Sequence, residues 1–115
     1  MTNGSARLDG AYSERRTDPR YMFIATAEII EPASDTHISG RVSEISRKGC
    51  YVDLLNTLPK DTPIRVQITT DHGKFECAGF VIYVQDRMGM GVAFVNPPND
   101  QQAILDGWLA DLAGR

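Results

Sequence analysis

The 115-residue sequence contains only two cysteines and two histidines. Cys50 and Cys77 do not form a CxxC pair, and only His37 and His72 could add nitrogen ligands, so the pattern gives little support to a zinc site. Two isolated cysteines are more typical of buried thiols than of metal ligands. We therefore expect both thiols to be buried, and two cysteines alone do not define the redox compartment.

Positive charge is also scarce, because 12 lysines and arginines face 15 acidic residues, for a formal net charge of −3. A general nucleic-acid binder would be basic overall, since phosphate contacts dominate its affinity. No apolar run approaches the roughly 18 residues of a membrane-spanning helix, and no signal segment opens the chain. We expect a cytoplasmic protein without membrane insertion or general nucleic-acid binding.

The sequence shows no set of residues that catalysis would require, such as a nucleophile with its base, paired carboxylates or a metal cluster. His37 and His72 lie in polar, turn-like contexts ("SDTHIS" and "TDHGK") and are expected to be solvated. The "GMG" at 89–91 lacks the longer glycine spacing and the following helix of a phosphate-binding loop. A binding module without metal or cofactor is therefore expected rather than an enzyme.

Residues 21–96 alternate between apolar and polar positions and are divided by Gly, Pro, Asn and Asp at short intervals, which predicts antiparallel strands. The expected inward faces are Phe23, Ala25, Ala27 and Ile29; Cys50, Val52 and Leu54; Ile64, Val66 and Ile68; and Met90, Val92 and Phe94. The segment "KFECAGFVIYVQ" is apolar on both faces in its second half, so another element should cover it there. The expected fold is mainly all-β, a six-stranded antiparallel barrel that leaves no exposed edge.

The two ends of the chain do not show the strand pattern of residues 21–96. Residues 1–14 lack periodicity and are expected to form a flexible tail. Residues 98–113 predict one C-terminal helix, in which Asn99 and Gln102 would form a capping box. Its apolar stripe could bind a partner, but closing one end of the barrel is favoured, since a helix of this length is marginal without packing. The stripe consists of Ile104, Leu105, Trp108, Leu109 and Leu112.

Two short stretches carry the functional signal. "SERRTDPRYMF" places Arg15, Arg16 and Arg20 directly before the first strand, where they would repel one another unless an anionic, planar group met them. "EISRKG", between two strands, offers the hydroxyl of Ser46 as donor and acceptor. Gly49 could adopt the positive φ of a tight turn and let a ligand approach the backbone. By itself the second stretch would more simply be an ordinary hairpin turn.

Together, RRxxxR and a motif one residue away from [D/N]xSxxG resemble the PilZ family of cyclic di-GMP receptors, over residues 15 to about 112. The resemblance also includes "GMGVAF" and the terminal helix, and it implies a PilZ domain at 15–115. The family usually has Asp or Asn where this chain has Glu44, whose longer side chain could accept from guanine only after a backbone or rotamer shift. The ligand-binding residues that the resemblance implies are Arg15, Arg16, Arg20, Glu44, Ser46 and Gly49.

The resemblance implies a stand-alone adaptor, monomeric or weakly dimeric, which orders its arginine segment on binding cyclic di-GMP. The changed surface would then be read by an unidentified partner protein. In the family, an arginine at the place of Arg15 goes with two intercalated ligands per chain. The alternatives are a degenerate PilZ module that binds only protein and, less favoured, a small-barrel nucleic-acid binder.

Overall fold

The computed structural model describes residues 18–114, which form six strands and a helix; the predicted tail, residues 1–14, lies outside this range. All strand pairs are antiparallel, in the closed order β1-β2-β3-β6-β5-β4. The elements are β1 (Tyr21–Glu31), β2 (Thr36–Ile45), β3 (Gly49–Asp53), β4 (Pro63–Thr70), β5 (Gly73–Gln85), β6 (Gly89–Val95) and α2 (Asn99–Ala113). The predicted fold class, a six-stranded barrel with one C-terminal helix, is confirmed.

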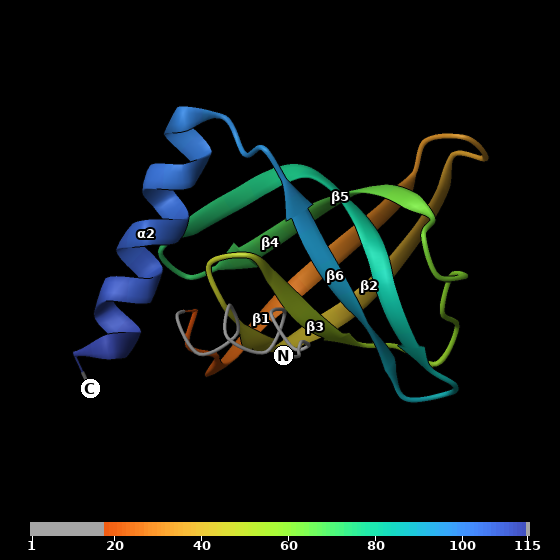
Figure 1. Ribbon diagram of the computed structural model, residues 1–115, viewed down its shortest axis with the longest axis horizontal. Coiled ribbons are helices and arrows are strands. Elements are labelled where there is room, and N and C mark those ends of the chain that lie inside the picture. Colours follow the sequence, from red (N-terminus) through yellow and green to blue (C-terminus); the bar gives the residue numbers. More distant parts are fainter. Residues whose placement is uncertain (1–17, 115) are drawn as a thin grey trace, which may run out of the picture.

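The barrel consists of two three-stranded meanders, β1-β2-β3 and β4-β5-β6 (Figure 1). Two seams join them, because β1 pairs with β4 and β3 pairs with β6. Each strand therefore has a hydrogen-bonded neighbour on both sides. Closure leaves no free strand edge on which another chain could add a strand.

The core fills the inside of the barrel as the alternation predicted. Each of the four expected inward faces is buried or packs against the buried core. The largest fully buried side chains include Phe75, Ile29, Ile45, Ile68 and Met90. Cys50 and Cys77 are buried free thiols, which confirms their expected place in the core.

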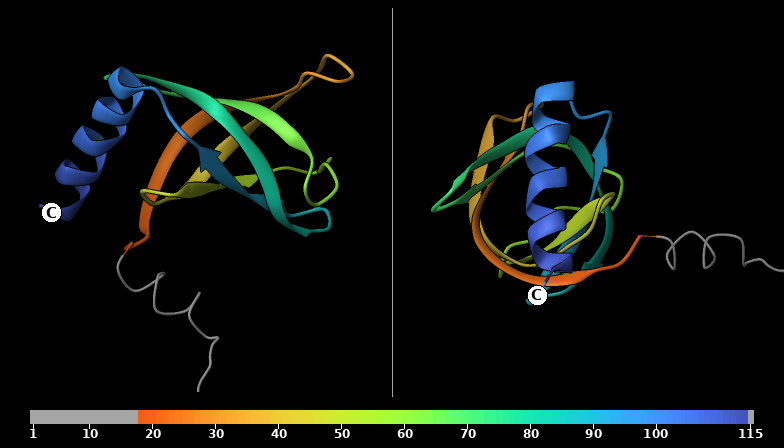
Figure 2. Two further views of the ribbon diagram at one scale, coloured as in Figure 1. Left: turned by 45° about the horizontal axis from the view of Figure 1, so that its top comes forward. Right: turned by 90° about the vertical axis from the view of Figure 1, so that its left-hand side faces the viewer.

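Helix α2 lies across one end of the barrel (Figure 2). Leu105 and Leu112 are buried, and the Trp108 ring packs against Phe23 and Phe75 with centroid distances of 5.4 and 6.3 Å. The apolar stripe thus closes the barrel. No helix among residues 18–114 is long and apolar enough to cross a membrane.

The predicted capping box is wrong. Pro98 is the N-cap residue, and no side chain caps the helix. The backbone N–H of Gln102 donates to the Pro98 carbonyl at 2.8 Å, while its side chain donates to Asp106 one turn later. Because the proline side chain carries no hydrogen-bond acceptor, an N-cap at Pro98 leaves the N–H groups of the first turn without a side-chain partner.

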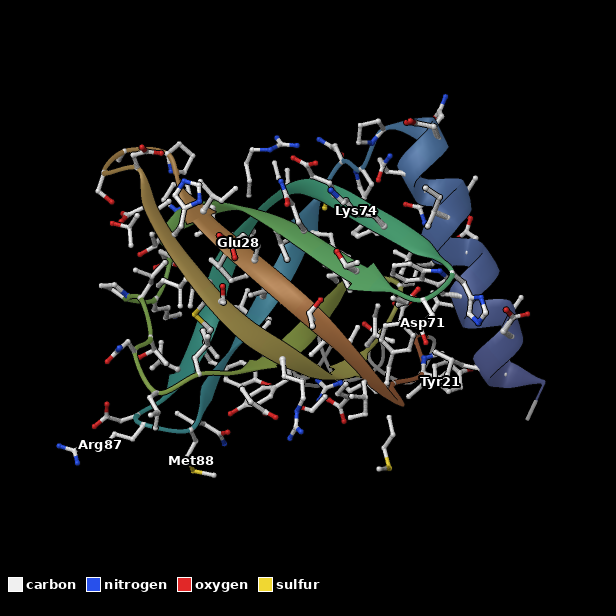
Figure 3. The ribbon with its side chains drawn as sticks, turned by 180° about the vertical axis from the view of Figure 1, so that it is seen from behind. Tyr21, Glu28, Asp71, Lys74, Arg87 and Met88 are labelled. Carbon is white, nitrogen blue, oxygen red and sulfur yellow. The ribbon has the colours of Figure 1, made fainter. Side chains whose placement is uncertain are left out.

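The second half of β5 differs from its prediction. Ile82, Tyr83 and Val84 were expected to be covered, yet each remains 37% exposed. The register of β5 against β6 shifts between Val81 and Tyr83, so two β5 residues oppose one β6 residue there. Such a bulge turns consecutive side chains outward. Figure 3 shows the end of this hairpin, with Arg87 and Met88, far from α2.

If α2 stabilises the barrel by apolar packing, Leu105→Ala should lower the free energy of unfolding by about 2–5 kcal/mol through loss of contact and a cavity. Leu55→Ala is the matched control, because Leu55 is 76% exposed, and it should change stability by less than about 0.5 kcal/mol. Urea denaturation with an unchanged m-value measures both. Equal, small effects would show that α2 does not contribute to the folded barrel.

Candidate functional site

A cavity of about 470 Å³ opens on the side of the barrel where the β3–β6 seam lies. Its volume is within the range of about 300–1,000 Å³ that small-molecule sites occupy. Its lining comes from the segment before β1, the end of β2, the β2–β3 turn, β3, β5 and β6. The lining residues are Asp18, Arg20, Glu44, Ile45, Ser46, Lys48, Gly49, Cys50, Tyr51, Ile82, Tyr83, Gly91, Val92 and Ala93.

The β2–β3 turn, residues 46–48, is held by backbone hydrogen bonds. The Ser46 N–H donates to the Gly49 carbonyl at 2.8 Å, and the Phe94 N–H donates to the Lys48 carbonyl at 2.8 Å. The Ser46 hydroxyl accepts from the Lys48 N–H at 3.2 Å and donates to the Gly49 carbonyl at 3.4 Å. Ser46 therefore shapes the turn, and one lone pair of its oxygen stays available to a ligand.

Gly49 is needed for a different reason from the one expected. It is not among the residues with positive φ, so the turn does not depend on a left-handed conformation here. It is the first residue of β3 and pairs with Ala93, and a Cβ at this position would overlap the Val92 carbonyl oxygen. The glycine allows β3 and β6 to approach closely, which positions the whole turn.

Glu44 faces the cavity because β2 carries a bulge. The register of β2 against β3 shifts between Val42 and Glu44, so that Val42 and Ile45 are both buried. Without the bulge, strict alternation would point Glu44 into the core with Val42. Turned outward, Glu44 reaches Arg20, with 3.6 Å between Oε1 and Nη1.

A second ion pair links the same two segments with opposite polarity. Asp18 contributes the carboxylate and Lys48, in the β2–β3 turn, the ammonium group, with 3.4 Å between Oδ2 and Nζ. The Asp18 side chain is only 15% exposed. Residues 18–20 are therefore held beside the turn by two charge contacts.

Part of the cavity wall is aromatic. The Tyr51 and Tyr83 rings lie 6.1 Å apart at an interplanar angle of 30°, and the Tyr51 hydroxyl donates to Gln85. Gly91 leaves room for the Tyr83 ring, since a Cβ there would overlap it. Burial raises the pKa of the Tyr51 hydroxyl, with smaller effects from Tyr83 and Asp53. A flat, half-exposed aromatic surface of this kind can stack on a nucleobase.

The thiol beside this wall is inert. Burial, followed by the neighbouring Cys77, raises the pKa of Cys50 to about 12. Burial also raises the pKa of Cys77 to about 11. A thiol that stays protonated is a poor nucleophile and a poor metal ligand. Within residues 18–114 no group of three or more His, Cys, Asp and Glu side chains could hold a metal ion.

The histidines lie outside the cavity. His37 is at the start of β2 rather than in a turn and contacts Asp35 and Glu28, each at 3.2 Å, which raises its pKa. His72 lies in the exposed turn between β4 and β5.

The structure brings four of the six predicted ligand-binding residues together around the cavity: Arg20, Glu44, Ser46 and Gly49. Arg15 and Arg16 lie outside the described residues. That these residues bind a ligand stays a prediction. Sequence reasoning missed Asp18, Lys48 and the two tyrosines. The sequence signal that could have identified Tyr83 is the second half of β5, which is apolar on both faces. Ile82 and Tyr83 of this half line the cavity.

The model of the PilZ domain family matches residues 14–111, most of the chain. The chain belongs to the PilZ family. Comparison with curated proteins gave no match.

Solved structures with the same fold agree with this assignment. The PilZ domain of YcgR from Escherichia coli, with c-di-GMP, has a TM-score of 0.70 at 14% identity over 86% of this chain and 92% of that chain. The PilZ domain of CeSA from a cellulose-synthesizing bacterium has a TM-score of 0.61 at 14% identity, over 84% and 96%. The inhibitor of motility MotI/DgrA from Bacillus subtilis has a TM-score of 0.71 at 18% identity, over 88% of this chain. This PilZ chain spans about half, 53%, of that inhibitor.

In this PilZ domain Gly49→Ala should reduce the free energy of unfolding by about 1–3 kcal/mol, because β3 and β6 must separate to admit the methyl group. Gly107→Ala is the matched control, since nothing lies within 4 Å of a Cβ at this exposed helical position. It should stabilise by about 0.5–1 kcal/mol. Urea denaturation of both variants measures the two opposite signs, and a neutral Gly49→Ala would contradict the close approach.

Proposed function

We propose that the protein is a cyclic di-GMP-binding adaptor whose ligand occupies the cavity beside the β3–β6 seam. The observation that carries the proposal is the meeting of Arg20, Glu44, Ser46 and Gly49 around that cavity. PilZ proteins are a family of cyclic di-GMP receptors, and the YcgR domain of the same fold was solved with that ligand.

The chemistry of the arginines suits such a ligand. A guanidinium binds phosphate through two parallel hydrogen bonds, and it also binds O6 and N7 of guanine. Its flat face stacks on a base, which a lysine cannot do. Arg20 borders the cavity, and Arg15 and Arg16 precede Asp18, another lining residue, by three and two positions in the sequence. The tyrosine wall offers a further stacking surface for guanine.

The output we propose is a change of surface. On binding, the arginine segment that contains Arg15 and Arg16 would become ordered next to residues 18–20, which lie beside the β2–β3 turn. A partner protein would then recognise the face formed by ligand and arginine segment, an order–disorder mode of signalling. We propose a receptor rather than an enzyme, because the lining offers phosphate and base contacts and its thiol stays protonated.

A second candidate is a PilZ module that binds only protein. The observation in its favour is Glu44, which occupies the place of the shorter family residue and pairs with Arg20. The alternative therefore predicts that cyclic di-GMP does not bind.

Isothermal titration of the folded protein with cyclic di-GMP tests the proposal, with saturable binding in the micromolar range expected. Arg20→Ala should weaken binding by about 1.5–3 kcal/mol, the contribution of one charge-assisted hydrogen bond. Arg65→Ala is the matched control, because Arg65 pairs with Glu76 at 3.3 Å outside the cavity, and it should leave the affinity unchanged. Absence of saturable heat at high micromolar ligand would refute nucleotide binding.

Arg15 leads to an expectation about stoichiometry. A second dinucleotide brings two more phosphates into the site, which would repel the first pair unless another cation lay nearby. Arg15 supplies that charge and a flat face for the outer guanine. We expect native mass spectrometry to show two ligands per chain at saturation, and Arg15→Leu to reduce the number towards one. A single ligand on the unmodified protein would be the contrary result.

A further inference from the structure

The described lining of the cavity carries four charged side chains, and all four are engaged with one another. Arg20 pairs with Glu44 at 3.6 Å, and Lys48 pairs with Asp18 at 3.4 Å. The segment before β1 supplies one cation and one anion, and the β2–β3 side supplies the complementary two. The four charges cancel, so an anionic ligand meets no free cation among the described lining residues.

Backbone contacts hold the β2–β3 side of this arrangement in place. Hydrogen bonds from the Phe94 N–H to the Lys48 carbonyl and from the Ser46 N–H to the Gly49 carbonyl fix the turn to β6 and β3. Glu44 is fixed by its register opposite Tyr51. The Arg20 and Glu44 side chains are 51% and 43% exposed. Exposed pairs of this kind are weak, so an incoming anion can open the contact.

We propose that Glu44 is an internal competitor for Arg20, which a ligand must displace before the guanidinium can bind it. The inference rests on the proposed function and adds a control on affinity at the same site. When the ligand binds, a phosphate or a base edge replaces the carboxylate of Glu44 as the partner of Arg20. Glu44 thereby raises the ligand concentration at which the adaptor responds.

Glu44→Gln isolates the charge, because glutamine keeps the chain length and an acceptor oxygen for guanine. Breaking one exposed pair corresponds to about two- to fivefold tighter binding of cyclic di-GMP. Binding by the variant should also weaken more steeply with added salt, since in the unmodified protein salt loosens the competing pair as well. Glu76→Gln is the matched control, because Glu76 pairs with Arg65 at 3.3 Å with similar exposure outside the cavity. The affinity of this variant for cyclic di-GMP should not change.

The gain must depend on Arg20. In an Arg20→Ala background, Glu44→Gln should give no further tightening of cyclic di-GMP binding. NMR titration measures this, because it reaches the weak affinities expected of these variants. If the gain persists in full, Glu44 acts by repelling the ligand directly, and the competition is overturned.

A measurement without ligand tests the pair itself. The melting temperatures of Arg20→Ala, Glu44→Gln and the double variant, followed by circular dichroism, form a double-mutant cycle. We expect each single change to lower the melting temperature by about 1–5 °C, and the double change to lower it no further than the larger single one. Additive shifts would mean that the two side chains do not interact and would overturn the proposal.

The outcomes separate the two proposals. Equal affinity of the unmodified protein and Glu44→Gln overturns the competition and leaves cyclic di-GMP binding intact. If neither protein binds cyclic di-GMP, the proposed function fails and competition for that ligand fails with it, whatever the melting cycle reports about the pair.

Discussion

The pairing of β3 with β6 is the constraint on which the site depends. It is one of the two seams that close the barrel, and at Gly49 the strands are so close that no side chain fits against the Val92 carbonyl. The contact from the Phe94 N–H to the Lys48 carbonyl extends this seam into the β2–β3 turn. Glu44, Ser46 and Lys48 are consequently held at the cavity that Tyr83 also lines.

Closure also determines where the cavity-lining side chains point. A six-stranded barrel must bend its strands sharply, and β-bulges are one way to do so. Two bulges lie beside the cavity, between Val42 and Glu44 in β2 and between Val81 and Tyr83 in β5. Each interrupts the inward alternation and turns one side chain outward. The curvature that completes the core therefore also exposes Glu44 and Tyr83.

The sequence predicted most of the fold, because period-two alternation and turn residues report directly on burial and chain reversal. It also located the two motifs that meet at the cavity, where the structure places Arg20 and Ser46. A bulge produces no recognisable pattern of apolar and polar residues in the sequence, so the exposure of Ile82 and Tyr83 could not be predicted from the alternation. The reason for Gly49 was missed as well, since close approach to Val92 depends on which strands pair across the seam.

The charge balance of the cavity makes the residues ahead of Asp18 decisive. Because the charges of Asp18, Arg20, Glu44 and Lys48 cancel, the cyclic di-GMP that we propose as ligand would be attracted by charge outside the described lining. Arg16 is two residues from Asp18, at most about 7 Å of extended chain. In the proposed function, the barrel would supply a cavity whose described charges balance, and the arginines that precede Asp18 in the sequence would supply the positive charge.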